Sequence, residues 1–228
     1  MTDPIRHRFT PTAGLLLLGV MAALMLPSQA PARQRTWLQQ LRAQFGYNPP
    51  LAPGGSRGPG QGQDGSICLI TPQPKRQDPA TALVTMPSPT LVSQQPLAEW
   101  RLEDSQGRKL AGALARSDRP IEGPIAWPLP PLQPGQTVTL RLRSMQASGS
   151  DDVEIRLQAA SASEQAQGLK MIGNPRDRLE IVQTLLQQGK TSEALELVFA
   201  PFQGSPSALL LDLRQSLMRN GCSPEGLR

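Results

Sequence analysis

The sequence predicts a mainly β protein with a helical C-terminal tail: an antiparallel β-sandwich followed by a three-helix element. Apolar and polar residues alternate with a period of two in several segments between residues 67 and 160. Turn residues separate those segments, and after Gln165 the apolar period changes to about 3.6. The 24 prolines and 20 glycines are typical of a chain built from short elements and many turns.

The alternation predicts three strands most clearly, at residues 98–103, 138–143 and 153–158. Shorter candidates lie at residues 82–86, 109–115 and 124–127. The segment Asp104-Ser105-Gln106-Gly107 predicts a hairpin turn, because Asp and Gly are favoured there. Strands with one apolar and one polar face are typical of antiparallel sheets. We therefore expect a sandwich of about five to seven strands over residues 67–160.

The C-terminal region, residues 170–221, is predicted to form three helices. Asn174-Pro175 is typical of a helix start, and Gly189 ends that helix. The second helix begins at Thr191 and ends before Pro201, and the third spans residues 205–220. The connection between the first two is short, which predicts that they form an antiparallel pair.

Residues 1–32 predict a secretory signal peptide. A cationic start precedes an apolar block at residues 13–26, which is shorter than the roughly 20 residues of a membrane-spanning helix. Ala30 and Ala32 fit a signal-peptidase site, so cleavage is expected near Ala32. The alternative is an uncleaved N-terminal anchor. Either outcome predicts a periplasmic or secreted body, and no stable membrane span is expected after cleavage.

Two segments separate this leader from the predicted sandwich. Residues 33–46 predict a short amphipathic helix, with Trp37, Leu41 and Phe45 at helical spacing. Residues 47–66 are rich in Gly and Pro and predict a flexible linker.

Two cysteines remain after the leader, Cys68 and Cys222. In an oxidising compartment an even count favours one disulfide, which would join the start of the sandwich to the C-terminal tail. The alternative is a pair of buried or free thiols, because sequence gives no distance between them.

Charge argues against nucleic acid as a partner. Removing Arg6, Arg8 and Asp3 with the leader leaves 23 − 2 = 21 basic and 18 − 1 = 17 acidic residues. The basic residues are scattered singly, with no platform of aromatic and basic side chains. A mixed, solvated surface is the simpler interpretation.

The candidate catalytic groups are few. His7, the sole histidine, lies in the predicted leader, so the mature chain lacks histidine for acid–base catalysis, catalytic triads or zinc ligation. The carboxylate pairs Glu103-Asp104 and Asp151-Asp152 flank polar turns. We therefore expect no enzymatic activity, no cofactor and no metal, with a carboxylate-dependent hydrolase as an alternative.

The order of a leader, a Gly-rich segment before Cys68, the segment Thr81-Ala82-Leu83-Val84 and a helical tail resembles the cyanobacterial domain-of-unknown-function family numbered 928. The resemblance covers roughly residues 54–200. Members carry a second cysteine after the strand that here ends at Ser144, and its absence leaves Cys222 as the only candidate partner for Cys68. The family has no assigned activity, so the resemblance implies location and architecture but no substrate.

These observations predict an exported, non-enzymatic protein that interacts with another envelope or secreted protein. The apolar residues Leu195, Phe199 and Phe202 are the candidate interaction surface, because they exceed what a small sandwich can cover. An alternative is a carbohydrate-binding module in which Trp100 and Trp127 form a sugar-stacking platform. Packing of both tryptophans in the core or at a sheet edge is the competing interpretation.

Overall fold

The computed structural model describes residues 39–46, 50–51, 66–75, 79–116, 118–147, 152–172, 177–202 and 204–222. All of them belong to one compact unit, Trp37–Arg228. The predicted leader and most of the predicted linker lie outside the described residues. Residues 39–45 are helical, within the helix expected at 33–46. Leu51 forms an antiparallel bridge with Ile67, so residues near both ends of the linker lie side by side.

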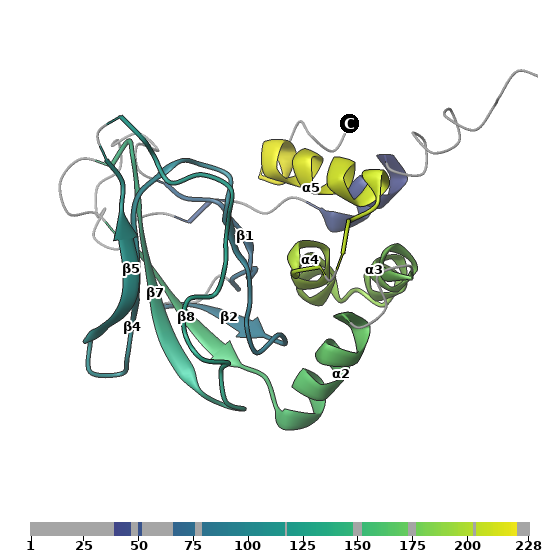
Figure 1. Ribbon diagram of the computed structural model, residues 1–228, viewed down its shortest axis with the longest axis horizontal. Coiled ribbons are helices and arrows are strands. Elements are labelled where there is room, and N and C mark those ends of the chain that lie inside the picture. Colours follow the sequence, from purple (N-terminus) through teal and green to yellow (C-terminus); the bar gives the residue numbers. More distant parts are fainter. Residues whose placement is uncertain are drawn as a thin grey trace, which may run out of the picture. The chain divides into compact units, whose positions relative to one another are not determined.

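The strands form two sheets packed together, which confirms the predicted sandwich (Figure 1). The smaller sheet has the order β1-β3-β6, built from β1 (Leu69–Thr71), β3 (Leu91–Ser93) and β6 (Pro124–Ile125). The larger has the order β2-β8-β7-β4-β5, built from β2 (Ala80–Val84), β8 (Val153–Ala159), β7 (Thr137–Ser144), β4 (Leu97–Glu103) and β5 (Lys109–Leu114). Among the described strands, only β2 and β8 pair in parallel. All six predicted strands are present, and β1 and β3 are additional.

The five-stranded sheet has one apolar face and one polar face, as the alternation predicts. Leu102 on β4 lies opposite Leu140 on β7, which lies opposite Ile155 on β8, and all three are buried against the smaller sheet. Their sequence neighbours point to the other side because successive side chains on a strand alternate. That other side, which we call the outer face, carries the charged residues of β4, β7 and β8.

The three-stranded sheet is covered on both sides. Leu69 and Leu91 pack with the apolar face of the larger sheet, whereas Ile70 and Val92 pack with the helices. A strand buried on both faces has an unbroken apolar sequence rather than an alternating one. This explains why the alternation of apolar and polar residues does not predict β1 and β3.

Four helices follow the sheets (Figure 1): α2 (Ala162–Ile172), α3 (Arg178–Gln187), α4 (Thr191–Phe199) and α5 (Ala208–Asn220). The last three are the predicted helices. Leu41 and Phe45 of the N-terminal helical segment join their apolar core. Within the described part of the chain, none of the helices has both the length and the apolar character needed to cross a membrane.

Helix α2 is the element that the helical periodicity missed, although its start has a sequence signature. The Ser161 hydroxyl and backbone N–H both donate to the Glu164 carboxylate, at 2.6 and 2.9 Å, and the Glu164 N–H donates back to the hydroxyl. This is a capping box, which the pattern Ser-x-x-Glu encodes. The Ser161 hydrogen bonds lower the pKa of Glu164.

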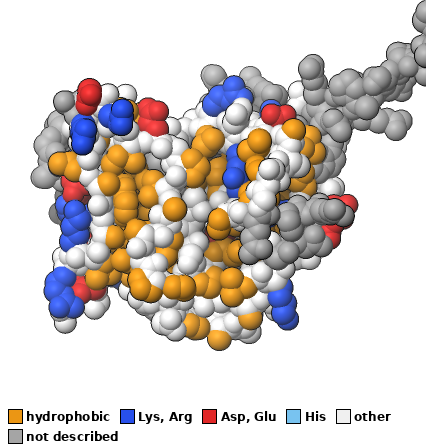
Figure 2. Space-filling view, in the orientation of Figure 1, with side chains coloured by type: hydrophobic (Ala, Val, Ile, Leu, Met, Phe, Trp, Pro, Cys, Tyr) orange, Lys and Arg blue, Asp and Glu red, His pale blue; other side chains and the backbone are white. Residues whose placement is uncertain are grey.

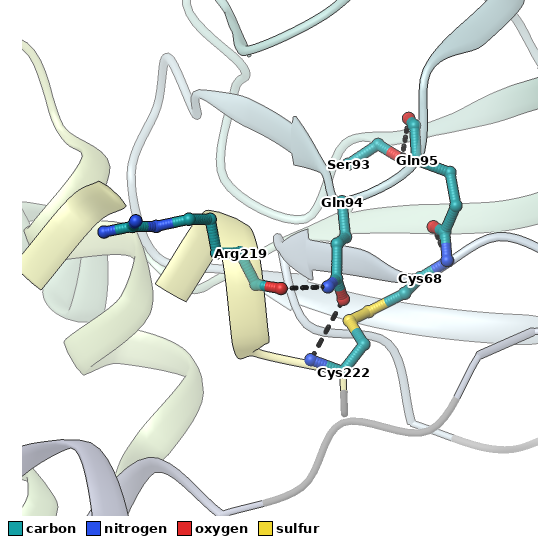
Figure 3. The surroundings of a disulfide bond; sticks show 6 residues. All are labelled: Cys68, Ser93, Gln94, Gln95, Arg219 and Cys222. Atoms are coloured by element: carbon teal, nitrogen blue, oxygen red, sulfur yellow. Dashed lines mark hydrogen bonds between the residues drawn. A yellow bond between two sulfur atoms is a disulfide. The ribbon is translucent and has the colours of Figure 1, made fainter. Parts of the chain in front are cut away.

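A disulfide joins Cys68, just before β1, to Cys222, just after α5 (Figure 3). The bonded residues are 154 positions apart, with their Cα atoms 6.1 Å from each other. Beside them the Gln94 side chain accepts from the Cys222 N–H at 3.1 Å and donates to the Arg219 carbonyl. The Gln95 side chain accepts from the Cys68 N–H at 2.7 Å. The structure therefore resolves the two sequence alternatives in favour of a bridge.

Candidate functional site

The outer face of the five-stranded sheet carries the densest group of interacting charged side chains among the described residues. The members are Glu99, Arg101 and Glu103 on β4, Arg141 and Arg143 on β7, Asp152, and Glu154 on β8. Figure 2 shows charged side chains gathered along the side of the molecule where β4 and β5 lie. The strands place them there because alternate residues of each strand share this face.

The ion pairs of the outer face cross from strand to strand. Glu103 accepts from both Arg101 and Arg141, with Nε–O distances of 2.7 and 2.8 Å. Arg101 also reaches Asp152 at 2.8 Å, and Arg143 reaches Glu99 at 2.7 Å. The hydrogen bond to Glu103 raises the pKa of Arg141. Each guanidinium is thereby fixed in orientation by at least one carboxylate.

The carboxylates lie deeper than the arginines that they hold. The side chains of Arg101, Arg141 and Arg143 are 27 to 32% exposed. Those of Glu99, Glu103 and Asp152 are only 11 to 16% exposed, although that of Glu154 is 39% exposed. The three guanidinium groups are therefore more accessible than most of the carboxylates that hold them.

A cleft of about 390 Å³ opens at the hairpin end of this face. Its lining includes Glu103, Asp104, Thr139, Arg141, Glu154 and Arg156. Arg156 is exposed, and no carboxylate pairs with it among the described residues. The cleft therefore combines one unpaired cation with a paired network.

The predicted carboxylate pairs have structural partners. Both oxygens of Glu103 are engaged by arginines. Asp104 accepts from the backbone N–H groups of Gln106 and Arg108, at 2.8 and 3.0 Å, and closes the β4–β5 hairpin. Those contacts, chiefly the Arg108 N–H, lower the pKa of Asp104. Asp151 lies outside the described residues. These contacts favour turn and ion-pair roles over acid–base catalysis.

The helical surface predicted from Leu195, Phe199 and Phe202 is wrong in two of its three residues. Leu195 and Phe199 are buried, because α4 is the central helix of its layer and is apolar on most of its sides. Phe202 is half-buried under the guanidinium of Arg178, which lies 3.8 Å from the ring centroid. These residues form the helical core rather than a docking surface.

Two arginines cap the C-terminus of α4. Arg178 donates to the carbonyls of Ala200 and Pro201, at 3.0 and 3.2 Å, and Arg214 donates to those of Val198 and Ala200, both at 2.7 Å. Cations at this end complement the helix dipole. Burial, with the nearby Arg214 charge, lowers the pKa of Arg178 to about 10. Both side chains are therefore used inside the fold.

The two tryptophans do not form a shared platform. Trp100 is buried between the sheets, so it cannot stack on a sugar. Trp127 is half-buried, and its indole N–H donates to the Pro130 carbonyl at 3.1 Å. Core packing accounts for the first, and a local loop contact accounts for the second.

The most unusual ionisable group, Glu196 on α4, was not singled out from the sequence. Its side chain is buried, and the carboxylate accepts from the Thr85 N–H, the Thr85 hydroxyl and the Met86 N–H, each at 2.9 Å. Burial raises the pKa of Glu196 to about 7, and the three hydrogen bonds oppose that rise. We call these contacts, together with the Cys68–Cys222 bridge, the helix–sheet junction.

Comparison with family models, curated proteins and solved structures found no match for the chain. The resemblance to the domain-of-unknown-function family therefore stays a prediction.

Proposed function

We propose that the chain is a non-enzymatic binding module of the periplasm or extracellular space, and that its outer face docks an acidic surface of another envelope or secreted protein. The disulfide supports the compartment, because such bonds persist where thiols are oxidised. The predicted leader supports the same placement.

The observation that carries this proposal is the arrangement of the outer-face arginines. Three guanidinium groups are held from below by carboxylates, so a partner does not have to immobilise them on binding. A planar guanidinium is the preferred donor to carboxylates across protein interfaces. A preordered row of such groups fits a surface rich in Asp and Glu.

Arg156 is the outer-face arginine most available to a partner. It lies in the cleft with Arg141, and it forms no ion pair with a described carboxylate, although Glu103, Asp104 and Glu154 line the same cleft. A partner carboxylate in the cleft would gain a charge-assisted hydrogen bond there. Complementary charge also directs the encounter, which makes association sensitive to salt.

The test compares Arg156→Glu with Lys170→Glu, a charge reversal at an exposed residue of α2. The mature protein is immobilised, envelope partners are captured and identified by mass spectrometry, and the affinity of the main partner is then measured. We expect Arg156→Glu to weaken that affinity at least about tenfold, and Lys170→Glu to leave it unchanged. The proposal would be overturned if both variants bound the partner with equal affinity, or if the affinity did not change with salt concentration.

A further inference from the structure

Strand β5 is an open edge of the five-stranded sheet. It pairs with β4 on one side, and no strand in the described residues pairs with its other side. Leu110 and Leu114 are 43% and 68% exposed on this strand. The opposite edge differs, because Thr81 of β2 forms a bridge with Lys75. Of the two edge strands of the five-stranded sheet, β5 is therefore the one without such a bridge among the described residues.

The backbone of β5 has hydrogen-bonding groups that face outward. The Ala115 N–H donates to the Ala98 carbonyl on β4 at 2.7 Å. Because successive residues of a strand alternate in direction, Ala113 and Ala111 face β4 as well. Gly112 and Leu114 therefore direct their N–H and C=O groups away from the sheet. An exposed edge of this kind is a template for another strand.

The sequence of this edge reads the same in both directions: Leu110-Ala111-Gly112-Ala113-Leu114. We infer that β5 pairs antiparallel with β5 of a second copy, about a two-fold axis at Gly112. In that register Leu110 of each copy lies opposite Leu114 of the other, and Ala111 lies opposite Ala113. The same surface then serves both copies, as a two-fold interface requires.

This pairing satisfies the exposed groups of the edge. Gly112 and its counterpart exchange two hydrogen bonds, and Leu114 offers a further outward N–H and C=O on each copy. Leu110 is less regular, because the β4–β5 register shifts between Leu102 and Glu103 and leaves Leu110 as the extra residue of a bulge. Leu114 lies opposite Glu99 and so on the outer face, and in the proposed register it meets the exposed Leu110 of the second copy. An apolar cross-strand pair of this kind stabilises a sheet. Gly112 leaves the centre without a side chain. An added Cβ there would lie 2.6 Å from the Trp100 carbonyl oxygen.

The ends of the pairing carry like charges, whose repulsion is reduced where a carboxylate binds one of them. The register places Arg108 opposite Arg116 of the second copy, and the Asp104 carboxylate already binds Arg108 at 2.7 Å. The two-fold axis puts the outer faces of both copies on the same side of one continuous sheet. A bound partner would then meet two guanidinium rows at once, which raises its avidity.

The experiment uses the mature, disulfide-bonded protein alone, so its outcome does not depend on the proposed partner. Sedimentation equilibrium should show a reversible dimer. Leu110→Asp and Leu114→Lys should each weaken that dimer at least about tenfold, because each places a charge opposite a leucine. Leu169→Lys, at an exposed leucine of α2, is the matched control and should leave the dimer intact.

Mixing the two weakened variants tests the register. In the mixed dimer Asp at 110 lies opposite Lys at 114, and the other pair keeps both leucines, so dimers should form again. Circular dichroism and thermal unfolding establish that each variant is folded. Any of three results would overturn the inference. The wild type could be monomeric at millimolar concentration, the single variants could still dimerise, or their mixture could stay monomeric.

Discussion

Glu103 on the outer face and Glu196 at the helix–sheet junction are both acidic side chains with little exposure to solvent, yet their partners differ in kind. Glu103 lies between two guanidinium groups. Glu196 has only neutral donors, two backbone N–H groups and one hydroxyl. Burial therefore raises the pKa of Glu196 to about 7, with no cation among its contacts to oppose the shift. Glu196, at the junction, is therefore an acidic group poised to titrate near neutral pH.

The disulfide is the strongest link of the junction, and removing it should have the largest effect. It closes a loop of 154 residues, for which the chain-entropy model gives about 5 kcal/mol. We expect reduction, or the double replacement Cys68→Ser with Cys222→Ser, to lower the free energy of unfolding by about that amount in urea titrations. Reduction of the double variant is the control and should change nothing further. An unchanged midpoint for the reduced wild type would contradict the prediction.

Glu196 should make the junction sensitive to pH. Its folded pKa of about 7 exceeds the ordinary value of 4.5, so the folded state binds the proton more tightly than the unfolded chain. The resulting stabilisation is fully present below about pH 4.5 and is lost as pH rises through 7. Between those limits it amounts to about 3 kcal/mol.

The variant Glu196→Gln isolates this contribution because the amide does not titrate. The difference in unfolding free energy, wild type minus variant, should fall by about 3 kcal/mol from pH 4 to pH 8. Carboxylates such as Asp104 and Glu164, whose lowered pKa values act in the opposite direction, cancel in this difference. A difference that stays flat across the range would show that Glu196 does not titrate there.

The contrast between these regions also marks what the sequence could predict. Strands β4, β7 and β8 have one polar, solvent-facing side, so the alternation of apolar and polar residues predicts both the strands and the outer face. Strands β1 and β3 are buried on both sides and show no alternation. The capping box of Ser161 and Glu164 could have revealed α2, but periodicity alone did not.

The junction was harder to predict because its partners are far apart in the chain. Thr85 and Glu196 are separated by 111 residues, and nothing in the local sequence links them. Glu196 interrupts an apolar run between Leu195 and Leu197, which is typical of a charged residue on a helix surface. The same run was interpreted as surplus apolar surface, whereas the fold makes α4 a central helix. The cysteine pair was the one junction contact that the sequence offered, because only two such residues remain.

Arg101 should show the smallest effect on stability, despite having more ionic contacts than its neighbours. It reaches Glu99, Glu103 and Asp152, but Glu99 keeps Arg143 and Glu103 keeps Arg141 when Arg101 is replaced. We therefore expect Arg101→Met, which keeps an unbranched side chain, to reduce the free energy of unfolding by only about 1 kcal/mol.

High salt should reduce even that small difference in unfolding free energy between the wild type and Arg101→Met, because partly exposed ion pairs are screened. A loss of about 3 kcal/mol or more in urea titrations would instead place Arg101 with the junction, as a residue that the fold depends on. A small loss of stability together with a large loss of partner affinity would assign the arginine row to binding. The two acidic regions would then have different roles. Carboxylates such as Glu103 on the outer face would hold arginines for partner binding, whereas the buried Glu196 would make the helix–sheet junction sensitive to pH.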